Sequence, residues 1–187
     1  ATTDYSGELN ISNEIIKRVS ESYRRIRNTL RFLSANLEDF DSNSMLINPN
    51  EILSIDRYGL YLVGELQNNV IKDYEEFDFY LAMQKFLSFC SEDMGGFYLD
   101  ILKDRLYTTA ENSHARRSAQ TALFHITQSL IRLMAPVLSF TAEELWNVVN
   151  KKNKSTIFVE SWYELPIHGL SKEELLGWRH AIDVRNL

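Results

Sequence analysis

Hydrophobic residues recur at steps of three and four along most of this chain, which is the spacing of one face of an α-helix. The first run begins just after Ser12, a residue type that is favourable as an N-cap, and continues to Leu37. Its apolar and aromatic positions are Ile15, Ile16, Val19, Tyr23, Ile26, Leu30, Leu33 and Leu37. The pattern predicts one long helix with a single buried face, followed by a loop over 39–50.

The next two runs predict two further helices. One covers 51–74, and the other begins at Phe79 and is apolar almost all round, so we expect it at the centre of a bundle. Gly95 and Gly96 interrupt this run before helical spacing resumes over 97–107. An interior glycine is about 1 kcal/mol less favourable than alanine in a helix. We therefore expect the pair to mark a kink or the close approach of a neighbouring helix.

Serine and threonine residues mark where the later helices begin. Ser113 is the expected N-cap of a fourth helix, which Pro136 ends or kinks. The sequence TAEE at 141–144 is a capping box that predicts a fifth, short helix through Val149. A second capping box, SKEE at 171–174, predicts a helix that reaches the end of the sequence.

These patterns together predict the fold class. We expect an all-α bundle of about five helices over 1–150, followed by a C-terminal extension over 151–187. Within the extension, 156–164 alternates loosely between apolar and polar residues and predicts a short strand or an irregular segment. The chain has only 7 Gly and 3 Pro, which argues against an all-β fold with many tight turns.

Composition adds information mainly through the single cysteine. Cys90 excludes an internal disulfide and a multi-cysteine zinc site within this sequence, and it indicates a reducing, cytoplasmic compartment. The longest apolar stretch is broken by Arg132 and is too short to span a bilayer, so we expect no membrane contact. The sequence starts without Met and ends within a predicted helix, so we expect it to be part of a longer protein.

The net charge of −6 argues against a nucleic-acid partner, but the distribution of charge changes this picture. Residues 12–37 carry six basic residues against two acidic ones, and residues 101–135 carry five against two. Residues 38–100 between them carry three basic residues against thirteen acidic ones. The two basic segments are able to attract a polyanion, or they are solvated helix faces beside acidic neighbours.

Basic residues stand beside aromatic ones in three short stretches: YRRIRNTLRF at 23–32, KDRLYT at 103–108 and SHARRS at 113–118. Arginine and lysine bind phosphates, helix N-termini offer free N–H groups, and unpaired bases stack on aromatic rings. Arg24, Arg27 and Arg31 each follow a position of the first apolar stripe by one residue, so they form a row along its edge. Alternatively, these arginines form ion pairs with the acidic middle of the chain, and Tyr23 and Phe32 belong to the core.

No catalytic or metal-binding motif is evident. The pair Glu111 and His114 has E-x-x-H spacing, but Glu111 precedes the expected cap of the fourth helix, so the two would not share a helical face. Cys90 and His125 are conceivable as a nucleophile and its base, although a free cysteine on an apolar stripe is usually a small core residue. We expect neither a metal site nor catalytic residues.

Three segments of the chain resemble a known family. They are DYSGELNISNEIIKRVSESYRRIRNTLRFLSANL, LSFCSEDMGGFYLDILKDRLYT and SHARRSAQTALFHITQSLIRLMAPVLSFTAEELW. In order and spacing they resemble the anticodon-binding helical domain of bacterial-type isoleucyl-tRNA synthetases, across about residues 4–187. The segment APVLSFTAEELW is less specific, because valyl, leucyl and methionyl enzymes have similar helices.

The resemblance implies a class I ligase that attaches isoleucine to tRNA(Ile) using ATP and Mg²⁺. It places the catalytic fold upstream, with HIGH and KMSKS signatures that do not occur in this sequence. Many members also hold zinc through cysteines further downstream. The resemblance therefore implies a non-catalytic piece without a cofactor of its own, in a cytoplasmic monomer. Its partners would be tRNA(Ile) and the catalytic and C-terminal domains of the same polypeptide. The alternative is a helical protein-interaction or spacer module that binds no RNA.

The resemblance also suggests how RNA would be held. Arg24, Arg27 and Arg31 would contact phosphates along the stem of the anticodon arm, with Asn28 as a sugar or base contact. A second phosphate site would form at the start of the first helix, from Asn10, Ser12 and the free N–H groups. The surface nearer the loop would be formed by Lys103, Arg105, Tyr107, Arg116 and Arg117.

Overall fold

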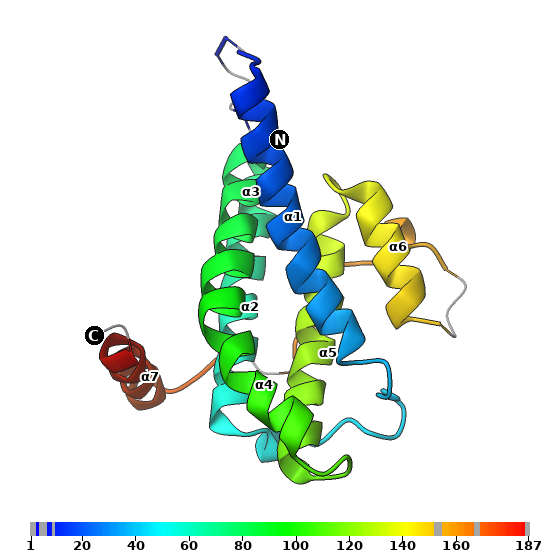
Figure 1. Cartoon of the computed structure of the whole chain (residues 1–187), viewed down its shortest axis with the longest axis vertical. Helices are drawn as coiled ribbons and strands as arrows, with labels where there is room; N and C mark the ends of the chain where they lie inside the picture. Colours follow the sequence, from blue (N-terminus) through cyan, green and yellow to red (C-terminus); the bar gives the residue numbers. More distant parts are fainter. Residues whose placement is uncertain (1–2, 4–6, 9, 152–154, 167–168, 186–187) are drawn as a thin grey trace.

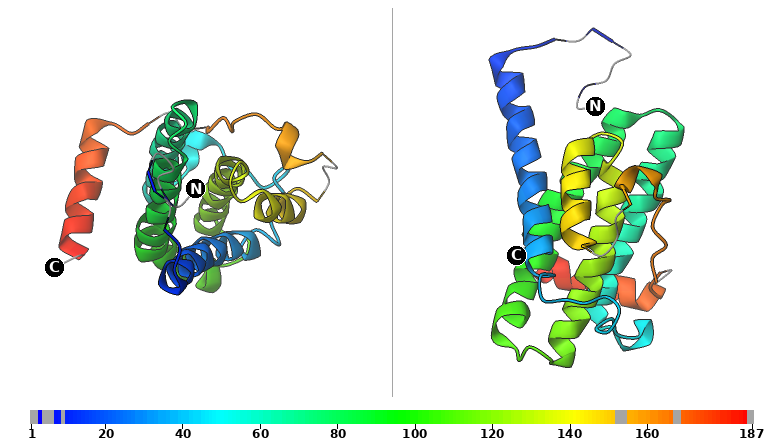
Figure 2. Two further views of the ribbon diagram at one scale, coloured as in Figure 1. Left: turned by 90° about the horizontal axis from the view of Figure 1, so that it is seen from above. Right: turned by 90° about the vertical axis from the view of Figure 1, so that its right-hand side faces the viewer.

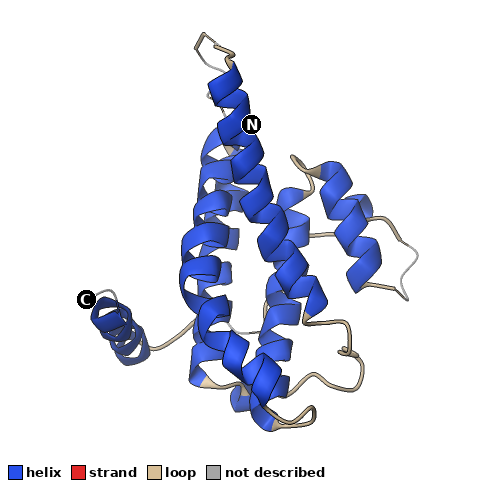
Figure 3. Ribbon diagram, in the orientation of Figure 1, coloured by secondary structure: helices blue, strands red, loops and turns tan. Residues whose placement is uncertain are grey.

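The computed structural model describes residues 3, 7–8, 10–151, 155–166 and 169–185. Within these ranges the regular structure is helical and no β-strand occurs, so the predicted all-α fold is confirmed (Figure 3). Three short non-α elements, η1 (Pro49–Glu51), η2 (Phe89–Tyr98) and η3 (Ile157–Val159), accompany the helices. The helices are α1 (Asn13–Ala35), α2 (Ser54–Glu75), α3 (Phe79–Ser88), α4 (Leu99–Thr108), α5 (His114–Met134), α6 (Ser139–Val149) and α7 (Lys172–Arg185).

The long helices form a bundle along the long axis of the molecule (Figures 1 and 2). α2 packs against both α3 and α5, and α1 contacts η2, α5 and α6. α6 lies on one side of the bundle, and α7 lies on the opposite side (Figure 1), where side-chain contacts join it to α2 and α4. The core is one continuous cluster of buried side chains drawn from α1 to α6 and η3.

The central helix is α5, and the prediction that the third helix occupies this place is wrong. Fifteen of the 21 residues of α5 are buried, against seven of the twenty residues of α3 and η2, which together contain the predicted third helix. Hydrophobicity alone does not reveal this, because many of the buried positions in α5 are small or polar. Their polar atoms are satisfied inside the bundle: the Thr127 hydroxyl donates to the Leu123 carbonyl, and the Ser129 hydroxyl donates to Gln67.

The glycine pair does not interrupt the helix that contains it. The chain runs without a break from α3 through η2 into α4, and η2 is a π-helix. A Cβ atom on Gly95 would lie 3.2 Å from the Cys90 carbonyl oxygen, and one on Gly96 would lie 3.6 Å from that of Ser91. Both atoms belong to the preceding turn of the same segment. Gly95 therefore relieves crowding within η2, a Cβ atom on Gly96 would make only ordinary contact, and neither glycine admits a neighbouring helix as predicted.

The capping predictions are confirmed at three helix starts and wrong at one. Ser12 and Ser113 cap α1 and α5, and Ser171 and Glu174 exchange reciprocal hydrogen bonds at the start of α7. α6, in contrast, begins at Ser139, so Thr141 lies inside it and does not cap it. The Thr141 hydroxyl instead pairs with the Tyr23 hydroxyl on α1 at 3.0 Å.

Of the two alternatives predicted for 156–164, the irregular segment is confirmed and the short strand is not, because this segment forms η3 followed by non-regular chain. A strand needs a neighbouring strand for its backbone groups. Here the backbone N–H of Ile157 instead donates to the Glu143 carboxylate on α6 at 3.0 Å, and the Thr156 hydroxyl donates to the same oxygen at 2.9 Å.

Residues 155–166, which we call the C-terminal strap, are held on α5 by two side chains. The Arg132 guanidinium lies 4.9 and 5.0 Å from the ring centroids of Trp146 and Tyr163, and it donates to the Ser161 carbonyl. The Nδ1 atom of His125 lies 2.7 Å from the Tyr163 hydroxyl. Over the described residues, no helix combines the length and hydrophobicity that crossing a bilayer requires.

Candidate nucleic-acid interface

The exposed face of α1 carries a row of basic and polar side chains. Lys17, Arg24, Asn28 and Arg31 are exposed, and their spacing of seven, four and three residues places them on one side of the helix. Lys17 and Arg31 lie about 21 Å apart at a rise of 1.5 Å per residue. Lys17, Arg24 and Arg31 form no ion pair with any described residue. We call this set of four residues the α1 row.

Arg27 belongs to the same side of α1 but is turned toward α6. Its guanidinium donates to both carboxylate oxygens of Glu144, at 3.1 and 3.2 Å, and to the Tyr23 hydroxyl at 3.1 Å. The hydrogen bonds to Tyr23 and Glu144 raise the pKa of Arg27 further above its usual value. Both members of the ion pair are about half exposed, so water screens it and its net stabilisation is small. The predicted acidic partner therefore exists, but it lies on α6 and not in the middle of the chain.

The basic residues around the α4–α5 corner do not form one exposed surface. Lys103 and Tyr107 are exposed, and Lys103 pairs with Asp100 at 3.1 Å. Arg105 is mostly buried and binds both carboxylate oxygens of the fully buried Asp56, at 2.5 and 3.0 Å. The Ser118 hydroxyl completes this buried cluster by donating to the same carboxylate. Arg105 therefore ties α4 to α2 and has no free face for RNA.

Arg116 and Arg117 are also engaged within the protein. Arg117 is 9% exposed and donates to Gln120 and Asn112 at 2.6 and 2.9 Å. Arg116 donates to the Leu106 carbonyl and to Asp39, the latter at 2.9 Å. Burial alone would raise the pKa of Asp39, but the Arg116 guanidinium holds it below its usual value. These two arginines fix the α4–α5 corner and the chain after α1.

The start of α1 is partly used by its own cap. The Ser12 hydroxyl oxygen accepts the backbone N–H of Ile15 at 3.2 Å, which satisfies one of the free donors of the first turn. Asn10 is exposed and lines a hollow of about 530 Å³ between α1 and α3. Asn10 and Ser12 thus both precede the first turn of α1, on the N-terminal side of Lys17.

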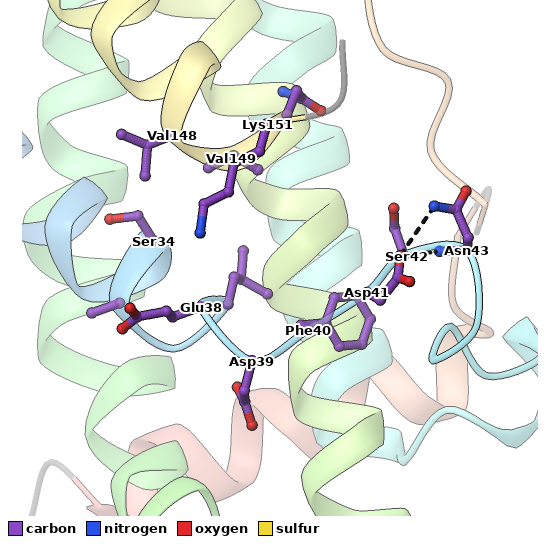
Figure 4. A pocket seen from close by; sticks show the side chains of 13 residues that line it. Ser34, Glu38, Asp39, Phe40, Asp41, Ser42, Asn43, Val148, Val149 and Lys151 are labelled. Carbon is purple, nitrogen blue, oxygen red and sulfur yellow. Dashed lines mark hydrogen bonds between the residues drawn. The ribbon is translucent and has the colours of Figure 1, made fainter.

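A cavity that sequence reasoning missed lies between the end of α1 and the end of α6 (Figure 4). Its volume is about 690 Å³, within the range of ligand sites. Val148 and Val149 line it from α6, and Phe40 lines it from the chain after α1. Glu38 and Lys151 are exposed at its rim. No local motif could have indicated this site, because its walls are far apart in the sequence.

Comparison with known proteins decides the family. Residues 56–186 match the family model described as the anticodon-binding domain of tRNA ligase. The chain belongs to this family. The anticodon-binding domain is similar to isoleucine–tRNA ligases from Paraburkholderia xenovorans (58% identity over 89% of the chain), Bordetella petrii (57% over 89%) and Dechloromonas aromatica (54% over 95%). It spans only 18–19% of the length of these three relatives.

The family resemblance inferred from the sequence is thereby confirmed, and the other candidate chemistry has structural explanations. In this anticodon-binding domain Cys90 is 1% exposed, and burial raises the pKa of its thiol well above the usual range. His125 holds the C-terminal strap through Tyr163. Across the described part of the chain, no three His, Cys, Asp or Glu side chains are grouped closely enough to hold a metal ion.

Proposed function

We propose that this chain docks the anticodon arm of tRNA(Ile) within an isoleucine–tRNA ligase, which attaches isoleucine to that tRNA using ATP and Mg²⁺. The observation that carries the proposal is the α1 row, whose three cationic side chains are exposed and unpaired among the described residues. The family match and the names of the relatives support the same assignment. The chain's acidic net charge does not oppose it, because local charge governs the approach of a polyanion.

In this proposal the α1 row follows the stem of the anticodon arm. Lys17, Arg24 and Arg31 contact successive phosphates, and Asn28 lies between them as a sugar or base contact. Arg27 contacts a phosphate only if its guanidinium first releases the Glu144 carboxylate. The exposed Lys103 and Tyr107 form a separate, smaller contact at the α4–α5 corner. Arg105, Arg116 and Arg117 support that corner from within.

The remaining parts of the enzyme supply its chemistry in this proposal. ATP, Mg²⁺ and any zinc belong to the regions of the longer polypeptide outside this chain, and the catalytic and C-terminal domains are its covalent neighbours. Asn10 and Ser12 lie at the end of α1 where a further phosphate could approach the remaining free N–H groups. We propose a cytoplasmic location, with which the free thiol of the single cysteine is consistent, and a monomeric enzyme as the family resemblance implies.

The test is a titration of the chain with tRNA(Ile) transcript at several salt concentrations. Three phosphate contacts predict a slope of about −2 to −3 in a plot of log affinity against log salt. The double variant Arg24→Ala and Arg31→Ala is expected to flatten this slope by about two units. Lys172→Ala, which removes an exposed charge from α7, is the matched control and should leave the slope unchanged.

Two outcomes of the titration would contradict this proposal. If the chain binds no tRNA at low salt but binds a basic protein, it is a protein-interaction or spacer module, and its acidic middle segment is the contact surface. An unchanged slope in the double variant would remove the α1 row from the interface even if RNA binds.

A further inference from the structure

The turn between α2 and α3 combines an unusual backbone with an exposed aromatic side chain. Phe77 is the one non-glycine residue with a positive φ in the described part of the chain, at 63°. It ends α2: its N–H donates to the Tyr74 carbonyl at 3.2 Å, and the Asp78 N–H donates to that of Asp73 at 2.7 Å. Glycine usually occupies such a position, because a Cβ atom is unfavourable there. The phenylalanine thus strains the turn, and its ring is 65% exposed and lies outside the core.

The surrounding contacts hold this ring in a fixed place. The Phe77 ring lies edge-on to the Phe79 ring at 6.2 Å between centroids, and the Phe79 ring lies 5.9 Å from that of Tyr74. Lys85 of α3 donates to both carboxylate oxygens of the buried Asp73 at 2.7 Å, which locks α3 onto the end of α2. A rigid aromatic side chain loses little conformational freedom when a partner covers it, and such side chains dominate the binding energy of many protein interfaces.

Carboxylates surround the exposed ring. Glu75, Glu76 and Asp78 are all exposed and lie within two residues of Phe77, and we call these four residues the Phe77 knob. Glu76 pairs with a lysine one turn earlier at 3.8 Å, whereas Glu75 and Asp78 form no ion pair with a described residue. Such a surface repels RNA and attracts lysine and arginine side chains. The Phe77 knob is therefore complementary to an apolar socket with a basic rim.

The Phe77 knob lies at the same end of the bundle as the start of α1 (Figure 1 and the right-hand view of Figure 2). Glu8 and Asn10, which precede α1, line a hollow of about 530 Å³ that Tyr80 of α3 also lines. The chain spans only 18–19% of the length of the three relatives named above. In a longer ligase, the part of the polypeptide that precedes this chain would therefore meet the bundle beside the Phe77 knob.

We propose that the Phe77 knob docks the bundle onto the part of the longer ligase that precedes this chain. Phe77 enters an apolar socket, and lysine or arginine side chains at the rim of that socket bind Glu75 and Asp78. The tRNA is not the partner, because the carboxylates would then lie beside phosphates. The inference rests on the proposed function, because it needs the chain to be part of a ligase.

Carboxylate labelling measures whether the Phe77 knob is covered. A carbodiimide couples an added amine to exposed carboxylates, and mass spectrometry gives the rate of coupling at each residue. Without tRNA, Glu75 and Asp78 are expected to react about tenfold more slowly in the full-length ligase than in the isolated chain, because labelling requires the undocked state. Equal rates in the two proteins would overturn the proposal.

Phe77→Gly separates the role of the ring from that of the turn. Glycine suits the positive φ, so the isolated variant is expected to fold like the unmodified chain. In the full-length ligase, the variant should bring the labelling of Glu75 and Asp78 to within about twofold of the rate in the isolated chain. Leu176→Ala, which removes another exposed apolar side chain, is the matched control and should leave the protection in place. Protection that persists in Phe77→Gly would overturn the proposal.

Labelling with and without tRNA(Ile) separates this proposal from the proposed function. Protection of Glu75 and Asp78 that appears only with tRNA would overturn the docking proposal. The salt-dependent binding of tRNA to the isolated chain depends on the α1 row, so it tests the proposed function independently. Phe77→Gly should leave that binding unchanged.

Discussion

At the scale of single residues, the most constrained charge is that of Asp56. Its carboxylate is fully buried and accepts hydrogen bonds from Arg105, the Tyr98 hydroxyl and the Ser118 hydroxyl. Burial and the neighbouring Asp56 carboxylate raise the pKa of Tyr98 well above its usual value, so Tyr98 remains a donor. A buried charge is tolerated only when such partners surround it. One side chain thus joins α2, η2, α4 and α5.

Asp56→Ala is expected to lower the free energy of unfolding by about 3–5 kcal/mol, because it leaves the Arg105 guanidinium mostly buried without its partner. Urea unfolding followed by circular dichroism measures the change. Asp100→Ala, which removes an ion-paired but half-exposed carboxylate, should lower the same free energy far less, because water screens its ion pairs. Equal losses in the two variants would contradict this account of Asp56.

Gly59 lies in contact with the same cluster. A Cβ atom at this position would lie 2.8 Å from the Tyr98 ring, which is buried and cannot move away freely. Gly59→Ala is therefore expected to lower the free energy of unfolding by about 1–3 kcal/mol, despite the better helix propensity of alanine. Gly177→Ala on α7 is the control: open space surrounds it, so the change should be neutral or stabilising by up to about 1 kcal/mol. Thermal unfolding of both variants compares them.

These residues also show why the candidate interface was only partly predictable. Arg24 and Arg31 were placed on α1 by helical spacing, and their exposure follows from that spacing. Arg105 has the same local appearance, but its partner Asp56 is 49 residues away and no local pattern pairs them. The cavity with Glu38 and Lys151 was missed for the same reason. Contacts across the sequence decide which arginines remain available to a ligand.

At the scale of elements, helix starts were predictable where a side chain satisfies the first free N–H groups. Ser12, Ser113 and Ser171 do so within three residues, which is visible in the sequence. The start of α6 was not predictable, because Leu138 precedes it and no side chain caps it. The central place of α5 was also hidden, since its buried serines, threonines and glutamines depend on partners from other helices.

The buried imidazole of His125, which contacts Tyr163 of the C-terminal strap, should make the free energy of unfolding fall at acidic pH. Burial lowers the pKa of His125 from 6.5 to about 4, so the unfolded chain takes up this proton at a higher pH than the folded one. The contribution of neutral His125 to the free energy of unfolding is therefore fully present above about pH 6.5. It is lost as the pH falls toward 4, and the total loss is on the order of 3 kcal/mol.

Urea unfolding at pH 7 and pH 5 tests this expectation, with His125→Gln as the reference. The free energy of unfolding should fall less between the two pH values in His125→Gln, because the variant lacks the titrating imidazole. The carboxylates contribute equally in both proteins and do not account for the difference. An identical loss in the two proteins would show that His125 does not contribute.

At the scale of the whole molecule, α7 is attached to the bundle but not built into its core. None of its described residues is buried. The Trp178 ring stacks on Tyr58 with 5.2 Å between centroids, and ion pairs join Arg57 to Glu174 and Arg185 to Asp100. The two ion pairs are partly exposed and contribute little, so Trp178 is the principal anchor.

Trp178→Ala is expected to increase amide hydrogen exchange throughout α7 while exchange in α2 and α5 stays slow. Leu176→Ala removes a side chain that is 54% exposed on α7 and should leave exchange nearly unchanged. Faster exchange across the entire bundle in Trp178→Ala would show instead that α7 is an integral part of the core.

The π-helical stretch η2 has a consequence for how the length of this chain can change. Phe86 before it and Leu102 after it are both buried, yet sixteen residues of uninterrupted α-helix would leave them about 160° apart at 100° per residue. The wider turns of η2 advance the chain through a smaller angle per residue, so they reset the rotational phase between α3 and α4. Deleting one residue within Phe89–Tyr98 would rotate α4 relative to α3 and carry Leu102 toward water. η2 therefore fixes the rotational register between α3 and α4, so a change of length here would disrupt the core, whereas the exposed turn at Asn43 and Ser44 carries no such constraint.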